Sequence, residues 1–263
     1  MSQIREPAVA GLFYPDSPAS LQQVVDELLQ QIPDSAEAPP KAIIVPHAGY
    51  LYSGPVAASA YARLRAARAS IRRVVLLGPS HRVGFSGLAT SSADTFRTPL
   101  GDIPVDTAAV AQINALPQVH VMDLAHQQEH SLEVQLPFLQ ESLENFTLVP
   151  LVVGDAGAEE VAEVLDKLWG GDETLIVIST DLSHYHDYAT AQRMDRHTSA
   201  AIEALRPEAI DHEGACGRNL LNGLLLLARK KQLHASTIDL RNSGDTAGSR
   251  DRVVGYGAYL FSA

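Results

Sequence analysis

Four short apolar runs along the chain have the pattern of strands buried on both faces of a sheet. Polar turn residues bound each run, and the runs cover residues 42–45, 74–77, 148–153 and 175–178. Strands that are apolar on both faces occur where helices cover both sides of a mostly parallel sheet. The pattern therefore predicts a covered sheet.

Segments with the spacing of amphipathic helices lie between and after these strands. They cover residues 56–67, 132–143, 158–168, 189–205 and 220–228. The alternation predicts an α/β fold. Residues 89–105 have the pattern of a hairpin around a turn at 99–102, and residues 236–240 can pair antiparallel with 253–261. We expect a central mixed, mostly parallel sheet flanked by helices.

The domain organisation is expected to be simple. The only linker-like stretch, residues 32–40, is too short and too near the start to separate two domains, so we predict one domain over residues 1–263. The composition, with 46% hydrophobic and 19% charged residues, is that of an ordinary globular protein. Because a domain of this size buries roughly three quarters of its unfolded surface, any metal site would serve function rather than folding.

Charge and hydropathy argue against several classes of partner. Twenty Lys and Arg against 31 Asp and Glu give a net charge of −11, which leaves no excess of cations for nucleic acid. The longest apolar run is interrupted at Asn222 and Gly223 and is shorter than the about 18 residues of a membrane span. The N-terminus lacks a signal-peptide pattern, and the single cysteine suits a reducing compartment. We expect a cytoplasmic protein that binds neither nucleic acid nor membranes.

Polar clusters follow three of the four predicted strands, and they contain His47, His81 and His184. Ligands of open α/β sheets bind beyond the carboxyl ends of parallel strands, so these histidines are expected to converge. Imidazole is a common ligand of Zn, Fe and Cu. The sequence therefore predicts a metal site with open positions. Taken alone, His47 can instead hydrogen-bond to a local turn carbonyl, and His81 can be a structural turn residue.

Two other residues, Asp181 and Cys216, have two interpretations each. Asp181 either caps a helix, with His184 exposed beyond it, or acts as a ligand or orienting group while His184 is a general acid or base. Cys216 precedes an apolar helix. It is either an inert buried thiol or, with a pKa lowered by the helix N-terminus and Arg218, a metal ligand or nucleophile.

The sequence from His126 to His130 matches the H-x-x-E-H pattern of one class of zinc peptidases. That chemistry needs both histidines on one helix, but Ser131 followed by Glu133 indicates that the helix begins near Ser131. We therefore interpret the match as partly accidental. Glu129 and His130 can still enter the same cavity from a loop, and first-turn charge that favours the helix dipole is the alternative.

Two residues are candidates for substrate binding outside the histidine clusters. Tyr50 can line a pocket wall or pack against the rim of the sheet. Arg218 can bind an anionic group or pair with a surface carboxylate. The chain has no glycine-rich phosphate-binding loop, so no nucleotide cofactor is expected.

Six ordered motifs resemble the Memo family, named for a mediator of cell motility and called AmmeMemoRadiSam system protein B in microbes. The motifs are VPHAGY at 45–50, LGPSH at 77–81, FRTPL at 96–100, EHSLE at 129–133, STDLSH at 179–184 and CGR at 216–218. The match spans nearly the whole chain. The resemblance implies a fold similar to the class III, LigB-type extradiol dioxygenases, which hold non-haem Fe(II) with two histidines and one carboxylate.

The resemblance also implies roles for individual residues. His47 and His81 match the family's two metal histidines, Cys216 matches its third ligand, and Asp181 and His184 match its remaining pocket residues. A thiolate thus stands where the dioxygenases place a carboxylate, and thiolates favour softer metals. We expect iron (Fe²⁺) as the metal, with copper or zinc as alternatives. The microbial name further implies a radical SAM protein and an AMMECR-type protein as partners.

The favoured hypothesis is an oxygen-dependent, dioxygenase-like redox enzyme that acts on an unknown small molecule or peptide. In it His184, oriented by Asp181 or Glu129, transfers a proton while the substrate is oxidised. The expected substrate-binding residues are Tyr50, His130 and Arg218. The alternative is a non-catalytic binding module that uses the same cleft for an anionic ligand or peptide. A metallohydrolase, which would depend on His126, is a third option.

Overall fold

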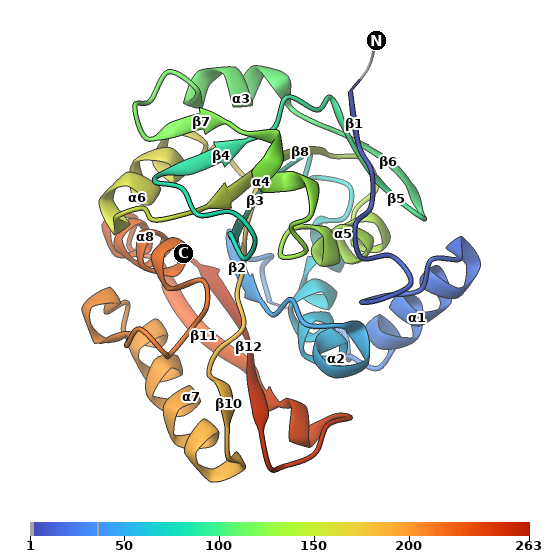
Figure 1. Cartoon of the computed structure of the whole chain (residues 1–263), viewed down its shortest axis with the longest axis vertical. Helices are drawn as coiled ribbons and strands as arrows, with labels where there is room; N and C mark the ends of the chain where they lie inside the picture. The colour runs from blue at the N-terminus through green and yellow to red at the C-terminus, as the bar shows by residue number, and fades with distance from the viewer. Residues whose placement is uncertain (1–2, 36) are drawn as a thin grey trace.

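A nine-stranded mixed sheet forms the centre of the molecule (Figure 1). The computed structural model describes residues 3–35 and 37–263. Residues 1, 2 and 36, which belong to the predicted domain and in part to the predicted stretch 32–40, lie outside this description. The strand order is β10-β12-β2-β9-β3-β8-β4-β7, and β11 pairs with β12.

Four parallel neighbours form the middle of this sheet, and they are the four predicted strands. They are β2 (Ala42–Val45), β9 (Thr174–Ser179), β3 (Arg73–Pro79) and β8 (Thr147–Val153). Apart from Arg73 and Thr147 at their starts, all their residues are buried, as expected of strands covered on both faces. Because they are parallel, their carboxyl ends meet at one edge of the sheet.

Antiparallel strands extend the sheet on both sides. On one side β4 (Leu88–Thr90) pairs antiparallel with β8 and parallel with β7 (Val119–Val121). On the other side β12 (Val253–Ser262) pairs antiparallel with β2, with β11 (His234–Asn242) and with the short β10 (His184–His186). The expected pairing of 236–240 with 253–261 is therefore confirmed, and so is the mixed, mostly parallel sheet.

A second, three-stranded sheet contains most of the predicted hairpin. Its strands are β1 (Ile4–Arg5), β5 (Thr95–Thr98) and β6 (Gly101–Pro104). β5 and β6 pair antiparallel, with Thr98 opposite Gly101, so the turn lies where the sequence predicts it. The predicted start at residue 89 is wrong, because Ala89 lies in β4 and pairs with Val152 of the central sheet.

Helices lie on both sides of the central sheet (Figure 1). On one side α6 (Ala158–Lys167) packs against α8 (Arg218–Lys230), and on the other α1 (Pro18–Gln30) packs against α2 (Tyr50–Tyr61) and α5 (Leu136–Ser142). α7 (Tyr188–Glu203) packs against β11 and β12. The shorter elements are α3 (Thr107–Ile113), α4 (Asp123–Gln127), η1 (Ala62–Ala67), η2 (Glu133–Gln135), η3 (Pro207–Ala209) and η4 (Ser243–Asp245).

The predicted helices are present, with two notable differences. α2 begins at Tyr50, six residues before the predicted start, because Gly54 and Pro55 hide the helical pattern of its first turns. α1 is an additional helix, whose Leu21 and Val25 point into the core. Among the described residues, no helix is both long enough and apolar enough to cross a lipid bilayer.

Candidate metal centre

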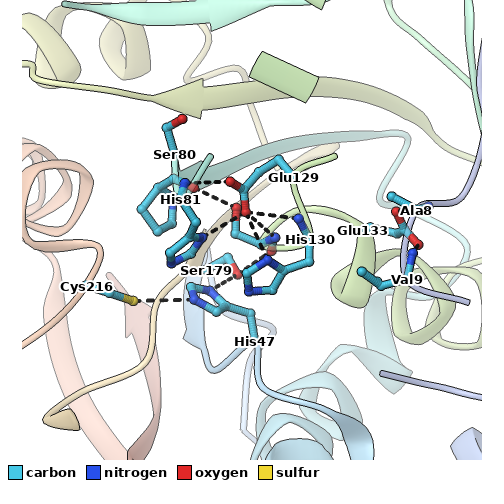
Figure 2. Close-up of polar contacts among 12 residues, drawn as sticks. Ala8, Val9, His47, Ser80, His81, Glu129, His130, Glu133, Ser179 and Cys216 are labelled. Atoms are coloured by element: carbon cyan, nitrogen blue, oxygen red, sulfur yellow. Dashed lines mark hydrogen bonds and ion pairs between the residues drawn. The ribbon is translucent and has the colours of Figure 1, made fainter. Parts of the chain in front are cut away.

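The carboxyl ends of β2 and β3 bring His47 and His81 to one place, as the sequence predicts, and the segment before α8 adds Cys216 (Figure 2). Among the described residues, His184, which was expected to converge with these histidines, is not a member of this group. One ligand atom each of His47, His81 and Cys216 lies within 4.8 Å of the other two. Nε2 of His47 is 3.4 Å from Sγ of Cys216. Residues separated by up to 169 positions in the chain thus converge on one small volume.

The His47 ring is buried, and its orientation is fixed from behind by Ser179 at the end of β9. Nδ1 of His47 lies 2.9 Å from Oγ of Ser179. This hydroxyl donates its only hydrogen to the Ser131 carbonyl over 2.6 Å and accepts a hydrogen bond from Gln135 Nε2 over 2.8 Å. Nδ1 of His47 must therefore be the donor, which leaves the lone pair of Nε2 directed at Cys216.

Glu129 orients His81 in a similar way. Oε1 of Glu129 lies 2.8 Å from Nδ1 of His81, and Oε2 accepts the backbone N–H of the same histidine over 2.6 Å. Backbone N–H groups of His130 and Ser131 also donate to this carboxylate, each over 2.9 Å. An ionised carboxylate only accepts hydrogen bonds, so Nδ1 of His81 carries the hydrogen and Nε2 is left free.

The titration properties of His47 and Glu129 keep the His47 lone pair available. Burial, together with the neighbouring His81, lowers the pKa of His47 to about 3. Burial alone would raise the pKa of Glu129, but the hydrogen bonds from His81 and Ser131 bring this pKa down to about 2. Near neutral pH, His47 is therefore neutral and Glu129 is ionised.

Cys216 is a protonated thiol in this environment. Burial raises its pKa to about 12, and the nearby Asp181 contributes in the same direction. The expectation of a lowered pKa is wrong, because burial outweighs the helix N-terminus and because Arg218 directs its Nε to the carbonyl of Ile210, 2.8 Å away. A metal ion would have to displace the thiol proton.

His130 is the third imidazole of the cluster. Its ring stacks on His81 with the centroids 4.6 Å apart and lies edge-on to His47 at 5.5 Å. Burial and the neighbouring His47 lower its pKa to about 4. Phe13 covers the ring at a centroid distance of 4.8 Å. His130 therefore faces the same space as the two candidate ligands, which is compatible with its predicted role in substrate binding.

Asp181 and His184 lie beside the centre. The hydrogen bond expected between them is not found among the described residues. Oδ1 of Asp181 accepts the backbone N–H of His47 over 2.7 Å, and Oδ2 is 4.0 Å from His47 Nε2. Burial raises the pKa of Asp181, and the hydrogen bond from His47 and the charge of His184 oppose this rise. Helix capping is excluded for Asp181, because Asp187 caps α7.

Among the described residues, neither of the two carboxylates expected to orient His184 forms a hydrogen bond with its ring. Glu129 binds His81, and Asp181 binds the backbone of His47. The His184 ring is half-buried and packs edge-on against Tyr185 at 5.9 Å.

Two further predictions are settled by where the side chains lie. Tyr50 is 5% exposed, donates its hydroxyl hydrogen to the Val134 carbonyl and packs against Phe138, so most of its side chain belongs to the core. The cavity that it borders, with Tyr14 and Leu51, is not the one beside Cys216. His126 faces away from the cluster, since its Nε2 contacts the Ala89 carbonyl at 3.0 Å. The H-x-x-E-H match is therefore accidental.

Ser179 and Gln135 are functional candidates that the sequence analysis did not identify. Gln135 Nε2 also donates to the Pro46 carbonyl over 2.9 Å, and its Oε1 accepts from the Tyr61 hydroxyl. Both residues are fully buried polar groups. Two features of the sequence could have indicated these residues: Ser179 ends the apolar strand β9, and Gln135 is a polar residue among apolar ones.

The donor set fits a transition-metal ion. Ligand bonds of about 2.0–2.3 Å place neighbouring donors of a tetrahedral site roughly 3.5 Å apart. The separation of 3.4 Å between His47 Nε2 and Cys216 Sγ already matches this value. Carboxylate or hydroxyl partners on the far nitrogens of both imidazoles are the usual supports of metal-bound histidines. A second set of donor atoms, from His81, Glu129 and His130, also lies within 4.8 Å, but Glu129 is already occupied by its hydrogen bonds.

Comparisons with known proteins identify the family of the chain. A family model described as Memo-like protein matches residues 5–260. A MEMO1 family protein of Aquifex aeolicus is 35% identical, with 98% of this chain and 99% of that protein covered. A MEMO1 family protein of Archaeoglobus fulgidus is 32% identical, with the same coverage.

The fold is also found in a solved structure of low sequence similarity. The crystal structure of an uncharacterized protein from Escherichia coli K12 superposes with a TM-score of 0.52 at 13% identity, with 82% of this chain and 98% of that chain covered. This likeness concerns the fold alone. Because the family model and the relatives match nearly the full length of the chain, the protein belongs to the Memo family.

Proposed function

We propose that this protein is a metal-dependent redox protein of dioxygenase-like type, in which His47, His81 and Cys216 hold an iron(II) ion. The observation that carries the proposal is that three ligand atoms from distant segments lie within 4.8 Å of one another. Both imidazoles are held from behind, by Ser179 and by Glu129. Imidazoles supported on their far nitrogens in this way are typical of metal-bound histidines, which favours a functional site over a structural one.

The ligand types favour a redox-active metal over magnesium or calcium. Imidazole and thiolate ligands suit iron, copper and zinc, whereas Mg²⁺ and Ca²⁺ prefer oxygen. Copper and zinc are therefore the alternatives to iron. When bound, a redox-active ion would supply electron transfer between a small-molecule substrate and an oxidant such as O₂.

The surrounding residues would accept protons from the substrate and exchange them with solvent. His130 is neutral near pH 7 and faces the cluster, so its ring can accept a proton from a bound substrate. His184 is half-buried close to the Asp181 carboxylate, and we assign it proton exchange with solvent. Asp181 holds the His47 backbone and places a carboxyl group beside these imidazoles.

Elemental analysis of protein purified without oxygen tests the metal site. We expect near-stoichiometric iron in the wild type and loss of the metal in His47→Ala and Cys216→Ser variants that keep their circular dichroism spectra. His126→Ala is the matched control, because His126 is also buried but bonds to Ala89. Wild-type protein that binds no iron, copper or zinc when these are supplied would contradict the proposal.

Oxygen consumption tests the redox step. With the metal bound and a substrate present, we expect O₂ uptake that falls in His130→Gln and His184→Gln variants while their metal content stays unchanged. A non-catalytic binding module is the second candidate, because the neighbouring cavity described below offers a free cationic group to a ligand. It predicts ligand binding without any O₂ uptake.

A further inference from the structure

A cavity of about 370 Å³ opens beside Cys216, over the carboxyl ends of β3 and β8. Its lining includes Ser80, Phe85, Asp155, His212, Cys216 and Arg218. Because Cys216 also faces His47, this cavity borders the candidate metal centre directly. Its position beyond the carboxyl ends of parallel strands is the usual place for a ligand in an α/β sheet, and its volume is near the small end of known ligand pockets.

Arg218 contributes free hydrogen-bond donors to this cavity. Its Nε donates to the Ile210 carbonyl over 2.8 Å, which fixes the side chain, and in the described part of the chain its terminal nitrogens have no carboxylate partner. Two other polar side chains of the lining are already engaged. The Ser80 hydroxyl donates to the Val83 carbonyl over 2.6 Å, and the Asn219 amide donates to the Gly154 carbonyl over 3.3 Å.

We propose that the cavity binds a small organic carboxylate, whose carboxylate group pairs with the terminal nitrogens of Arg218 while its apolar body extends past Cys216 toward the metal centre. The inference rests on the proposed function, because it makes this carboxylate the substrate of the His47, His81 and Cys216 site. A fixed, planar guanidinium presents two parallel N–H groups, and this arrangement matches the two oxygens of a carboxylate.

The charges and the apolar lining favour a carboxylate over a phosphate. Of the Lys, Arg, Asp and Glu residues, the lining contains Arg218 and Asp155, whose formal charges cancel. A monoanion leaves one negative charge in the cavity, whereas a phosphate dianion leaves two beside Asp155. Phe85 and Leu220 offer apolar surface to an organic body, which inorganic phosphate lacks.

Titrations with matched acids and amides test the proposal on the metal-free full-length chain. The probes are benzoate and butyrate, their neutral counterparts benzamide and butyramide, and inorganic phosphate, with dissociation constants from isothermal titration calorimetry. We expect each acid to bind at least about tenfold more tightly than its amide and than phosphate. Arg218→Met should abolish this preference, Arg218→Lys should keep part of it, and Arg229→Met, on the exposed end of the same helix, should leave it unchanged.

A second variant blocks the cavity without touching Arg218. A side chain at Gly84 would start in open space, so Gly84→Trp should fold normally and weaken binding of both the acids and the amides. Equal affinity for acid and amide, tighter binding of phosphate, absence of binding by every probe, or a preference that survives Arg218→Met would each overturn the proposal. Elemental analysis of the same preparations keeps the two hypotheses separate: a chain that holds metal but ignores carboxylates refutes only this inference, and a chain that binds carboxylates but no metal refutes only the metal centre.

Discussion

Gln135 Nε2 donates a hydrogen bond to the Ser179 hydroxyl over 2.8 Å, and this bond restricts the rotation of the hydroxyl behind the His47 ring. With one hydrogen donated to Ser131 and one acceptor site used by Gln135, the hydroxyl has a single acceptor site left for His47 Nδ1. The tautomer of His47 is thus determined by residues of η2 and β9. A metal-binding lone pair on Nε2 is therefore present before any metal arrives.

Ser179→Ala should lower the affinity of the centre for iron(II) by about 10- to 100-fold, because loss of such a supporting group frees the ring and its tautomer. Competition with a chelator of known affinity measures this change, and ¹⁵N NMR of the imidazole reports which nitrogen of His47 carries the hydrogen. Ser142→Ala is the matched control, since the Ser142 hydroxyl is also buried but has no hydrogen-bond partner among the described residues. Equal loss of affinity in both variants would contradict the assignment.

Glu129→Gln should destabilise the protein in a pH-dependent way. The folded-state pKa of Glu129 is about 2, below its ordinary value of 4.5, so its stabilising contribution is complete above pH 4.5 and disappears as the pH falls toward 2. From the shift we expect a loss of roughly 3 kcal/mol at pH 7. Urea unfolding at several pH values measures the difference, which should shrink below pH 4.5. The exposed Glu144→Gln should change stability by less than about 0.5 kcal/mol at any pH.

Metal binding should release a proton from Cys216. Because the thiol has a pKa of about 12 in the metal-free protein, it is protonated at pH 7 and must ionise to become a ligand. Calorimetric titration in buffers of different ionisation enthalpy should show about one proton released per metal ion, and affinity should rise with pH. Cys216→Ser should remove this proton release. Affinity that does not change between pH 6 and pH 9 would show that the sulfur is not a ligand.

The strands and their polar ends could be predicted because each depends on neighbouring residues. The run Ala42–Val45 is apolar without interruption, and the cluster with His47 follows it directly. Parallel pairing then brings His81 to the same edge without any further information. Cys216 and its place in the centre came from the family resemblance, since the run of small residues around it is compatible with an inert thiol as well.

The role of Glu129, the pKa of Cys216 and the burial of Tyr50 could not be predicted. They depend on contacts between distant segments, which a local sequence pattern does not show. Glu129 lies 48 positions from His81, and its role depends on how the loop before η2 folds over β3. The pKa of Cys216 was predicted in the wrong direction because burial is a property of the packed molecule. Tyr50 follows His47 by three residues, but the early start of α2 turns its side chain into the core.

Arg5→Met should destabilise the protein and also loosen the loop that carries Glu129. The Arg5 guanidinium forms a buried ion pair with Glu133 and donates to the carbonyls of His126, over 3.0 Å, and Glu129, over 2.6 Å. Removing it leaves the buried Glu133 carboxylate without its counter-charge, which typically costs about 3–5 kcal/mol. Because Glu129 orients His81, metal affinity should fall as well, although Arg5 is not a ligand. Urea unfolding and chelator competition measure the two effects, and Arg229→Met, which removes an exposed charge, is the control. A variant that loses stability but keeps full metal affinity would show that the Glu129 loop holds its position without Arg5.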